Sequence, residues 1–223
     1  MQDYDNATAN RLTEITKEFQ TGFELLKNYP KSVTFFGASH TKTGDPIYDN
    51  ARLLAGRIVQ DLGYSIVTGG SSGIMEAANR GAKEAGGHSL GLQINLPHEQ
   101  MINGYLTESA NFHHFFVRKV CLSFYAEAFV FYPGGYGTLD EFFEILTLIQ
   151  TGKIDRSPVI CVGSEYWNKM KDVLKTEVLG RKNIAPEDLD IFTITDNHDE
   201  ILEIVKNAPI RDKIPFELTK AIQ

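Results

Sequence analysis

The sequence predicts an α/β fold in which an open, mainly parallel sheet is covered by helices on both faces. Short apolar segments alternate along the chain with longer amphipathic segments, and this alternation is typical of parallel strands joined by helical crossovers. Two glycine-rich turns, 69–73 and 134–137, each follow an apolar segment. Open sheets bind ligands at the carboxyl ends of their strands, so these turns predict where the functional site lies.

The chain begins with a polar helical leader, 1–30, in which Pro30 breaks the helical pattern. After the first apolar strand, apolar residues recur at intervals of three and four from Ala51 to Leu62, and Gly63 ends that helix. The same unit of strand and helix then repeats along the chain. Strands are expected at 32–36, 64–68, 88–94, 112–116, 128–132, 159–162 and 192–195. Helices are expected at about 6–28, 51–62, 73–84, 117–126, 138–150, 165–179 and 198–207.

Composition indicates one globular domain over 1–223, with 208–223 as a C-terminal tail. Hydrophobic residues make up 42% of the 223 residues, which is enough for one sizeable core. The formal charge of -7 and the lack of a dense basic cluster argue against nucleic acid as a partner. Because the chain has neither a signal-peptide pattern nor an apolar run that could span a bilayer, we expect a cytoplasmic protein without a membrane partner.

The cysteines and histidines do not form a pattern that predicts a metal site. Cys121 and Cys161 lie in separate apolar segments, and neither has a partner at metal-binding spacing. His113 and His114 are adjacent, and neighbours on an extended segment point to opposite faces. We therefore expect neither a metal nor a cofactor.

The first glycine-rich turn, 69–73, joins a strand to a helix and allows close approach to its backbone. It lacks the spacing of a dinucleotide-binding turn and the Gly-Lys-Ser/Thr of a P-loop. A tight turn with a serine capping the helix explains the same residues, and a methionine at helical spacing is more often part of the core. The candidate ligand-binding residues here are Gly69, Gly70, Ser71, Gly73 and Met75.

The second turn, 134–137, exposes backbone N–H groups that no side chain shields, and the carboxylate of Glu141 follows it closely in the sequence. Its free N–H groups, the helix that follows and the Thr138 hydroxyl favour a bound phosphate. Glu141 is expected in the first helical turn, where it suits a phosphate ligand only if it faces another part of that ligand. Acids there also complement the helix dipole, which we favour for Asp140, because at most one of two successive residues faces the pocket. The candidate residues are Gly134, Gly135, Gly137, Thr138 and Glu141.

Arg118 and Lys119 are expected to open a helix, where a cation is unfavourable by up to about 1 kcal/mol without an anionic partner. That partner is either Glu141 or a ligand phosphate. The less favoured alternative is that the helix starts earlier or that both side chains reach into solvent. Asn103 is a weaker ligand-binding candidate, since polar residues on loops commonly cap backbone groups.

Two segments together resemble the LOG (Lonely Guy) family, whose members are also labelled possible lysine decarboxylases. These are Phe-Phe-Val-Arg-Lys at 115–119 and Pro-Gly-Gly-Tyr-Gly-Thr-Leu-Asp-Glu at 133–141. The resemblance runs from about 33 to 167, and the segments 96–100 and 146–153 are similar to the longer bacterial branch. It implies a Rossmann-like three-layer fold with about seven strands, and a homodimer or higher homo-oligomer.

The resemblance also implies roles for individual residues. Arg118 and Glu141 match the family's catalytic pair, and the two glycine turns with Thr138 match its phosphate-binding residues. Three positions depart from the longer branch: Ser71 and Ser72 replace the usual glycine and proline, and His40 lies where an arginine is common. These departures bear on phosphate affinity and base preference.

The implied activity is hydrolysis of the N-glycosidic bond of a nucleoside 5'-monophosphate, such as AMP or a cytokinin riboside monophosphate, to free base and ribose 5-phosphate. Cytokinin biosynthesis and nucleotide salvage are both open as its role. The alternative is a non-hydrolytic nucleotide-binding or molybdenum-cofactor carrier protein, although a mere binder needs no carboxylate like Glu141 beside a ribose. Lysine decarboxylation fits poorly, since it normally uses pyridoxal phosphate on a lysine in a much larger fold.

Overall fold

The structure is a computed structural model that describes residues 2–96 and 102–210. Most of the 96–100 segment and most of the predicted 208–223 tail lie outside the described residues. The described strands form one sheet, in which each pair of neighbours is parallel. The strands are β1 Ser32–Phe36, β2 Ser65–Thr68, β3 Ser89–Ile94, β4 Glu108–Phe112, β5 Ala128–Phe131, β6 Val159–Cys161 and β7 Phe192–Ile194.

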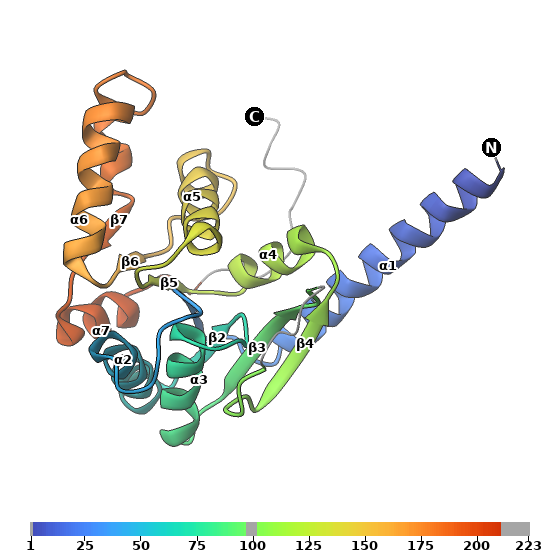
Figure 1. The fold of residues 1–223 in the computed structure, drawn as a ribbon, viewed down its shortest axis with the longest axis horizontal. Coiled ribbons are helices and arrows are strands. Elements are labelled where there is room, and N and C mark those ends of the chain that lie inside the picture. The colour runs from blue at the N-terminus through green and yellow to red at the C-terminus, as the bar shows by residue number, and fades with distance from the viewer. Residues whose placement is uncertain (1, 97–101, 211–223) are drawn as a thin grey trace.

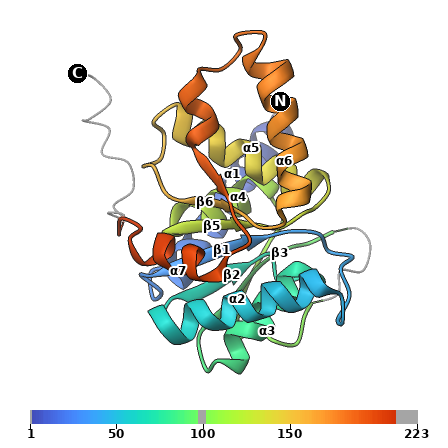
Figure 2. The same cartoon turned by 90° about the vertical axis from the view of Figure 1, so that its left-hand side faces the viewer.

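The sheet has seven strands in the order β4-β3-β2-β1-β5-β6-β7, and helices cover both of its faces (Figure 1). One face packs against α2, α3 and α7, and the other against α1, α4, α5 and α6 (Figure 2). The helices are α1 Gln2–Leu26, α2 Pro46–Leu62, α3 Ile74–Glu84, α4 Phe115–Phe124, α5 Tyr136–Gln150, α6 Ser164–Val173 and α7 His198–Lys206. The expected three-layer, Rossmann-like α/β fold is confirmed.

Alternation of side chains along the central strands explains the two cores. Val33 and Phe35 of β1 join the core under α2, α3 and α7, whereas Phe36 joins the core on the opposite face. In the adjacent strand, Val130 and Phe131 divide between the two cores in the same way. Strands that are buried on both faces are mainly apolar, and the two buried hydroxyls of β1, Ser32 and Thr34, donate hydrogen bonds to the Tyr125 and Leu122 carbonyls.

Local signals set the ends of α2. Asp45 caps the helix by accepting a hydrogen bond from the Ile47 N–H, and Pro46 occupies the first helical position. Gly63 ends the helix with a φ of 69°, a conformation that favours glycine, and its N–H donates to the Val59 carbonyl. The helix begins before the expected start at 51 because this cap and proline lie upstream of its apolar stripe.

Two predicted boundaries are wrong in ways that concern the site. The strand expected at 112–116 is β4, which ends at Phe112, and Phe115 and Phe116 already belong to α4. The helix expected from 138 begins at Tyr136. Arg118 is therefore the fourth residue of its helix rather than the first.

The C-terminal part also departs from the expected pattern. The helix expected at 165–179 is α6 followed by a π-helical segment, Leu174–Leu179, and a short 3-10 helix, Pro186–Asp190, precedes β7. Both additions lie between β6 and β7, away from the glycine turns (Figure 2). None of the helices in the described part of the chain has the length and hydrophobicity needed to cross a bilayer.

Helices α2 and α3 pack closely because glycines lie between them. A Cβ added at Gly81 of α3 would overlap the carbonyl group of Arg52 on α2. A Cβ added at Gly56 of α2 would instead meet its nearest atom, the Gly81 carbonyl oxygen, at 3.4 Å. The two glycines thus differ in how much room their surroundings leave.

Gly81→Ala is expected to destabilise the protein, because α2 and α3 must move apart to admit the methyl group. Overpacking of this kind costs about 1–3 kcal/mol, and urea unfolding followed by circular dichroism measures it. Gly56→Ala is the matched control, and it is expected to be neutral or to stabilise by up to about 1 kcal/mol, since alanine is the better helix former. Equal unfolding midpoints for the two variants would contradict this account of the packing.

Candidate functional site

A cavity of about 660 Å³ lies at the carboxyl ends of the central strands. The chain extends the sheet outward from β1 in one direction through β2 and in the other through β5, so the loops after β1 and β5 diverge there. This is the switch point at which open α/β sheets bind ligands. The loops after β1, β2 and β5 and the first turn of α4 line the cavity.

The structure brings most of the predicted site residues into this cavity. The predicted residues that line it are Gly69, Ser71, Met75, Arg118, Gly135, Gly137, Thr138 and Glu141. Five others lie outside the lining, namely Gly70, Gly73, Asn103, Lys119 and Gly134. The second group shapes or supports the cavity wall.

Arg118 of α4 reaches across the first glycine turn. Its Nε donates a hydrogen bond to the Leu92 carbonyl over 2.7 Å, which fixes the plane of the guanidinium. A Cβ added at Gly69 would overlap a terminal nitrogen of that guanidinium and the Met75 sulfur, so a larger residue there would displace these side chains. Burial lowers the pKa of Arg118, and the Glu141 carboxylate opposes that shift. An arginine nevertheless remains protonated in proteins, so it presents a positive charge to the cavity.

Glu141 is the buried acid of the cavity, with 8% of its surface exposed. It was expected in the first turn of its helix, but α5 begins earlier and places it in the second turn. Burial raises its pKa to about 7, although Arg118 and Lys119 act to lower it. Arg118 and Glu141, both described residues, make no direct ion pair. Both side chains nevertheless line the same cavity.

Lys119 points away from the cavity toward α5. Its Nζ lies 2.9 Å from an Asp140 oxygen and 3.1 Å from a Glu144 oxygen. The adjacent residues Arg118 and Lys119 thus have different partners, which follows from their positions about 100° apart around the helix. Lys119 joins α4 to α5 and so holds together the two helices that carry Arg118 and Glu141.

The second glycine turn is held from both sides. Thr138 folds over Gly134, where any Cβ would overlap the threonine hydroxyl. The Gly134 carbonyl accepts a hydrogen bond from the Tyr166 hydroxyl over 2.9 Å, and the Pro133 carbonyl accepts one from the Ala38 N–H over 3.0 Å. The turn therefore has a fixed conformation before any ligand binds.

A buried polar network holds the first glycine turn in the same way. Asn103 donates to the Ser71 carbonyl over 2.9 Å and to Asn79 Oδ1 over 3.0 Å. Thr68 donates to the same Asn79 oxygen and accepts from the Gly70 N–H. Asn103 thus supports the first glycine turn from the side away from the cavity. This agrees with the alternative that a polar loop residue binds backbone groups rather than the ligand.

The serine cap of α3, which was the alternative interpretation of this turn, does not form, because Gly73 is the N-cap residue of that helix. The Ser72 hydroxyl donates instead to the Ser39 carbonyl, which joins the first turn to the loop after β1. Gly73 has a φ of 73°, and a Cβ there would overlap the Ala38 carbonyl. The glycine is thus required by its backbone conformation and by this close contact.

For several residues that line the cavity, the sequence carries only a weak signal or none. Ser39 and His40 line the cavity, and their position directly after a strand was the available signal. Tyr136, 94% exposed, and Phe115 also line it, and no periodic signal distinguishes them from core aromatics. Asp140 was expected to face away, yet it lines the rim together with Glu141.

Two further observations complete the description of the site. A more open depression of about 690 Å³ along α5 is lined by Tyr136, Leu139, Phe143, Thr147 and Leu148 and by the carboxylates of Asp140 and Glu144, so no cation offsets the two negative charges in its lining. In the described ranges, no cluster of three or more His, Cys, Asp or Glu side chains is arranged to hold a metal ion.

Solved structures similar to this chain share its fold. One is the molybdenum cofactor carrier protein from Chlamydomonas reinhardtii, with a TM-score of 0.58 and 21% identity over 80% of this chain and 96% of that one. Another is the molybdenum cofactor binding protein from the phototrophic bacterium Rippkaea orientalis, with a TM-score of 0.55 and 20% identity over 79% of this chain and 94% of that one.

Relatives in sequence include two Arabidopsis thaliana proteins. Cytokinin riboside 5'-monophosphate phosphoribohydrolase LOG5 is 27% identical over 209 residues, which cover 90% of each chain. The corresponding LOG7 protein is 31% identical over 154 residues, which cover 66% of this chain and 68% of that one. Residues 75–205, which include Arg118 and Glu141, match the family described as Possible lysine decarboxylase. The chain therefore belongs to the LOG family, the group that bears this description.

Proposed function

We propose that this protein hydrolyses the N-glycosidic bond of a nucleoside 5'-monophosphate, either AMP or a cytokinin riboside monophosphate, to the free base and ribose 5-phosphate. One observation carries the proposal: the buried Glu141 carboxyl, with a pKa of about 7, shares a cavity with the Arg118 guanidinium and two glycine turns. The activity for which the LOG5 and LOG7 relatives are named supports the same reaction.

The 5'-phosphate is assigned to the second glycine turn. Gly135 and Gly137 line the cavity at the N-terminus of α5, where backbone N–H groups and the helix dipole favour an anion. The Thr138 hydroxyl lies at the same end of the helix and adds a donor. Glu141, one turn further along α5, then lies beside the ribose rather than the phosphate.

The reaction develops positive charge on the ribose ring as the bond between C1' and the base nitrogen breaks. The oxygen of a water molecule bonds to C1', and the electron pair of the broken bond leaves with the base. Ionised Glu141 stabilises the cationic ring and accepts the proton that the water loses, while the departing base takes up one proton. A carboxyl with a pKa near 7 suits proton transfer at neutral pH, because it is both ionised and basic enough.

Arg118 keeps Glu141 available as an anion. Its positive charge lowers the pKa of Glu141, which burial alone would raise further. Because the two groups make no direct ion pair, the carboxylate oxygens can approach the ribose and the attacking water. The terminal nitrogens of Arg118 also lie above Gly69, where they can donate to a ligand oxygen or to the leaving base.

A carrier that binds nucleotide-like cofactors is the second candidate, and the fold shared with molybdenum cofactor carrier proteins is the observation that favours it. Prolonged incubation with AMP separates the two functions, since a carrier returns AMP intact and a hydrolase releases adenine. Lysine decarboxylation has less support, because no lysine lines the cavity among the described residues.

Glu141→Gln is expected to lower kcat for release of ribose 5-phosphate from AMP by roughly 100-fold or more, because the amide neither accepts a proton nor offsets positive charge. A panel of nucleoside monophosphates, assayed for reducing sugar and free base, measures the effect. Adenosine is the control substrate, and it is expected to react poorly because it lacks the phosphate. Near wild-type turnover in folded Glu141→Gln would remove Glu141 from the mechanism.

The pH dependence follows from the raised pKa of Glu141. In the free enzyme the catalytic carboxylate loses its charge below about pH 7, so kcat/KM is expected to fall as the pH decreases through that value. A phosphate monoester takes up its own proton near pH ~6. If the fall in kcat/KM is centred near pH ~6 instead of near pH 7, the pH dependence comes from the substrate phosphate and not from Glu141.

The same shift predicts how stability depends on pH. The folded state keeps a proton on Glu141 that the unfolded state loses between pH 4.5 and about 7, so burial of this group destabilises the protein progressively over that range. Glu141→Gln removes this cost, which is on the order of 3 kcal/mol above pH 7. Thermal unfolding should therefore show the variant to be more stable than the wild type at pH 8 and similar to it at pH 4.

Gly69→Ala tests the position of Arg118 without changing a charged group. The added methyl group overlaps the guanidinium, so kcat/KM is expected to fall by about 10- to 100-fold while the fold is kept. Gly104→Ala is the control, because a Cβ there meets no atom within 4 Å. Equal kcat/KM for the two variants would mean that activity does not depend on the position of the Arg118 guanidinium.

A further inference from the structure

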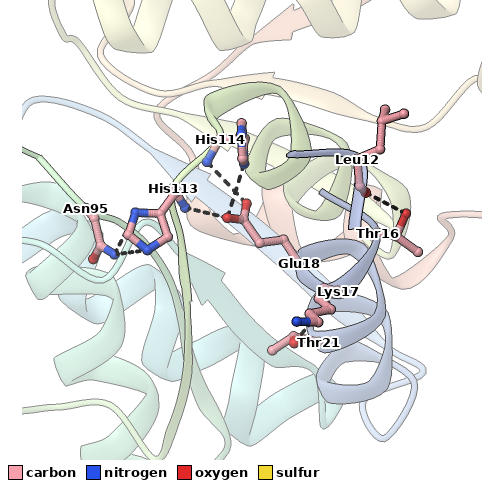
Figure 3. A network of polar contacts seen from close by, with 8 residues as sticks. All are labelled: Leu12, Thr16, Lys17, Glu18, Thr21, Asn95, His113 and His114. Carbon is pink, nitrogen blue, oxygen red and sulfur yellow. Dashed lines mark hydrogen bonds and ion pairs between the residues drawn. The ribbon is translucent and has the colours of Figure 1, made fainter. Parts of the chain in front are cut away.

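A buried carboxylate from α1 lies at the N-terminus of the helix that carries Arg118. Glu18 is 9% exposed. One of its oxygens accepts a hydrogen bond from the His113 N–H over 3.0 Å, and the other accepts from the His114 N–H over 3.1 Å (Figure 3). The first oxygen also lies 3.2 Å from Nδ1 of the His114 ring. The proposed mechanism assigns no role to this residue.

These bonds make Glu18 the cap of α4. His114 is the N-cap residue of α4, and its own side chain makes no capping hydrogen bond. The first N–H groups of a helix need acceptors, and a negative charge beside them is favourable. Here the acceptor comes from a helix 96 residues away in the chain rather than from the local sequence.

A short chain of hydrogen bonds joins this cap to the site. The N–H of His114 donates to Glu18, and the carbonyl of His114 accepts from the Arg118 N–H over 3.2 Å. Arg118 then reaches from this first turn of α4 to the Leu92 carbonyl on β3. Hydrogen bonds thus fix the first turn of α4 at its N-terminus, through Glu18, and fix the Arg118 side chain at its guanidinium, through Leu92.

Close packing one turn along α1 fixes the same pair of helices. Gly22 lies four residues after Glu18 and therefore on the same face of α1. A Cβ added at Gly22 would come within 2.5 Å of the Cys121 sulfur on α4 and 3.1 Å of the Phe112 ring. The backbone of α1 thus lies directly against α4, and Glu18 reaches the helix N-terminus from a fixed position.

We propose that Glu18 is a positioning residue that sets the location of the Arg118 guanidinium through the N-terminus of α4. Glu18 does not line the cavity, so it acts through this helix and not on the substrate. The N-terminal helix α1, which extends beyond the sheet in Figure 1, thereby becomes part of the active-site framework. The catalytic part of this proposal rests on the proposed function, because it takes Arg118 as a member of the hydrolytic site.

The kinetic test compares two substitutions with a matched control on the same helix. Glu18→Ala removes both acceptors, and kcat/KM for AMP is expected to fall by about 10- to 100-fold, as for other small displacements of a catalytic group. Glu18→Gln keeps one acceptor oxygen and is expected to give an intermediate value. Glu24→Ala changes an exposed glutamate of α1 and is expected to leave kcat/KM unchanged.

A spectroscopic arm tests the positioning without relying on turnover. In wild type, the Arg118 Nε–H is expected to give a slowly exchanging signal in a ¹⁵N spectrum, because it donates to the Leu92 carbonyl. Glu18→Ala is expected to shift this signal and speed its exchange while the amides of the sheet stay protected. Glu18→Gln decides the question if the alanine variant does not fold.

The two arms separate the two proposals. If wild type releases no ribose 5-phosphate while the Arg118 signal responds to Glu18 as expected, the proposed function fails and the positioning role stands. An unchanged Arg118 signal in folded Glu18→Gln and Glu18→Ala would overturn the positioning role, whatever the kinetics show.

Discussion

Burial of the Glu141 carboxyl without a direct counter-ion is the constraint around which this site is arranged. Burial raises its pKa to about 7, so near neutral pH the folded protein holds a partly ionised acid in a place that disfavours the charge. Arg118 and Lys119 reduce this cost from a distance, and Lys119 itself is occupied by Asp140 and Glu144. If Glu141 had only a structural role, an apolar residue in its place would give a more stable protein, because burying a charge generally reduces the free energy of unfolding.

The backbone of the cavity is fixed before any ligand arrives. The loop after β1 is bonded to both glycine turns, through Ala38 to Pro133 and through Ser72 to Ser39. Tyr166 and Asn103 hold the two turns from outside the cavity. Preorganised N–H groups need little rearrangement to bind an anion, which is the condition under which such groups contribute most to binding and to catalysis. Both glycine turns are thus held in place around the cavity that Arg118 and Glu141 line.

The fold was predictable from sequence because its signals are local. Apolar strands buried on both faces, and helices with apolar residues at intervals of three and four, define a parallel sheet without knowledge of distant contacts. Both glycine turns were located for the same reason. Arg118 and Glu141 were candidates from their positions near helix N-termini, and the family resemblance added their catalytic roles. Whether each predicted residue acts as assigned stays a prediction, although the cavity brings most of them together.

The wrong boundaries and unexpected roles arose where distant residues decide the local structure. The segment 112–116 has strand-like composition, but Glu18 from α1 satisfies the N–H groups of 113 and 114 and so starts a helix there. Asn103 was grouped with ligand-binding residues because its buried partners, Ser71 and Asn79, are far away in the sequence. Periodicity reports which face of an element is buried, and it carries no information about which partner covers that face.

The fold alone does not separate a hydrolase from a carrier, because molybdenum cofactor carrier and binding proteins of known structure align with 79–80% of this chain. The distinction lies in the ionisable groups of the cavity. A carrier must hold its ligand unchanged, and for that purpose hydrogen-bond donors and apolar walls suffice. Glu141 adds an acid whose charge is costly in the free protein and gains value only beside developing positive charge. We expect that acid, one helical turn from the phosphate site proposed at the N-terminus of α5 and with Arg118 favouring its ionised form, in a protein that breaks a glycosidic bond rather than in one that only binds its ligand.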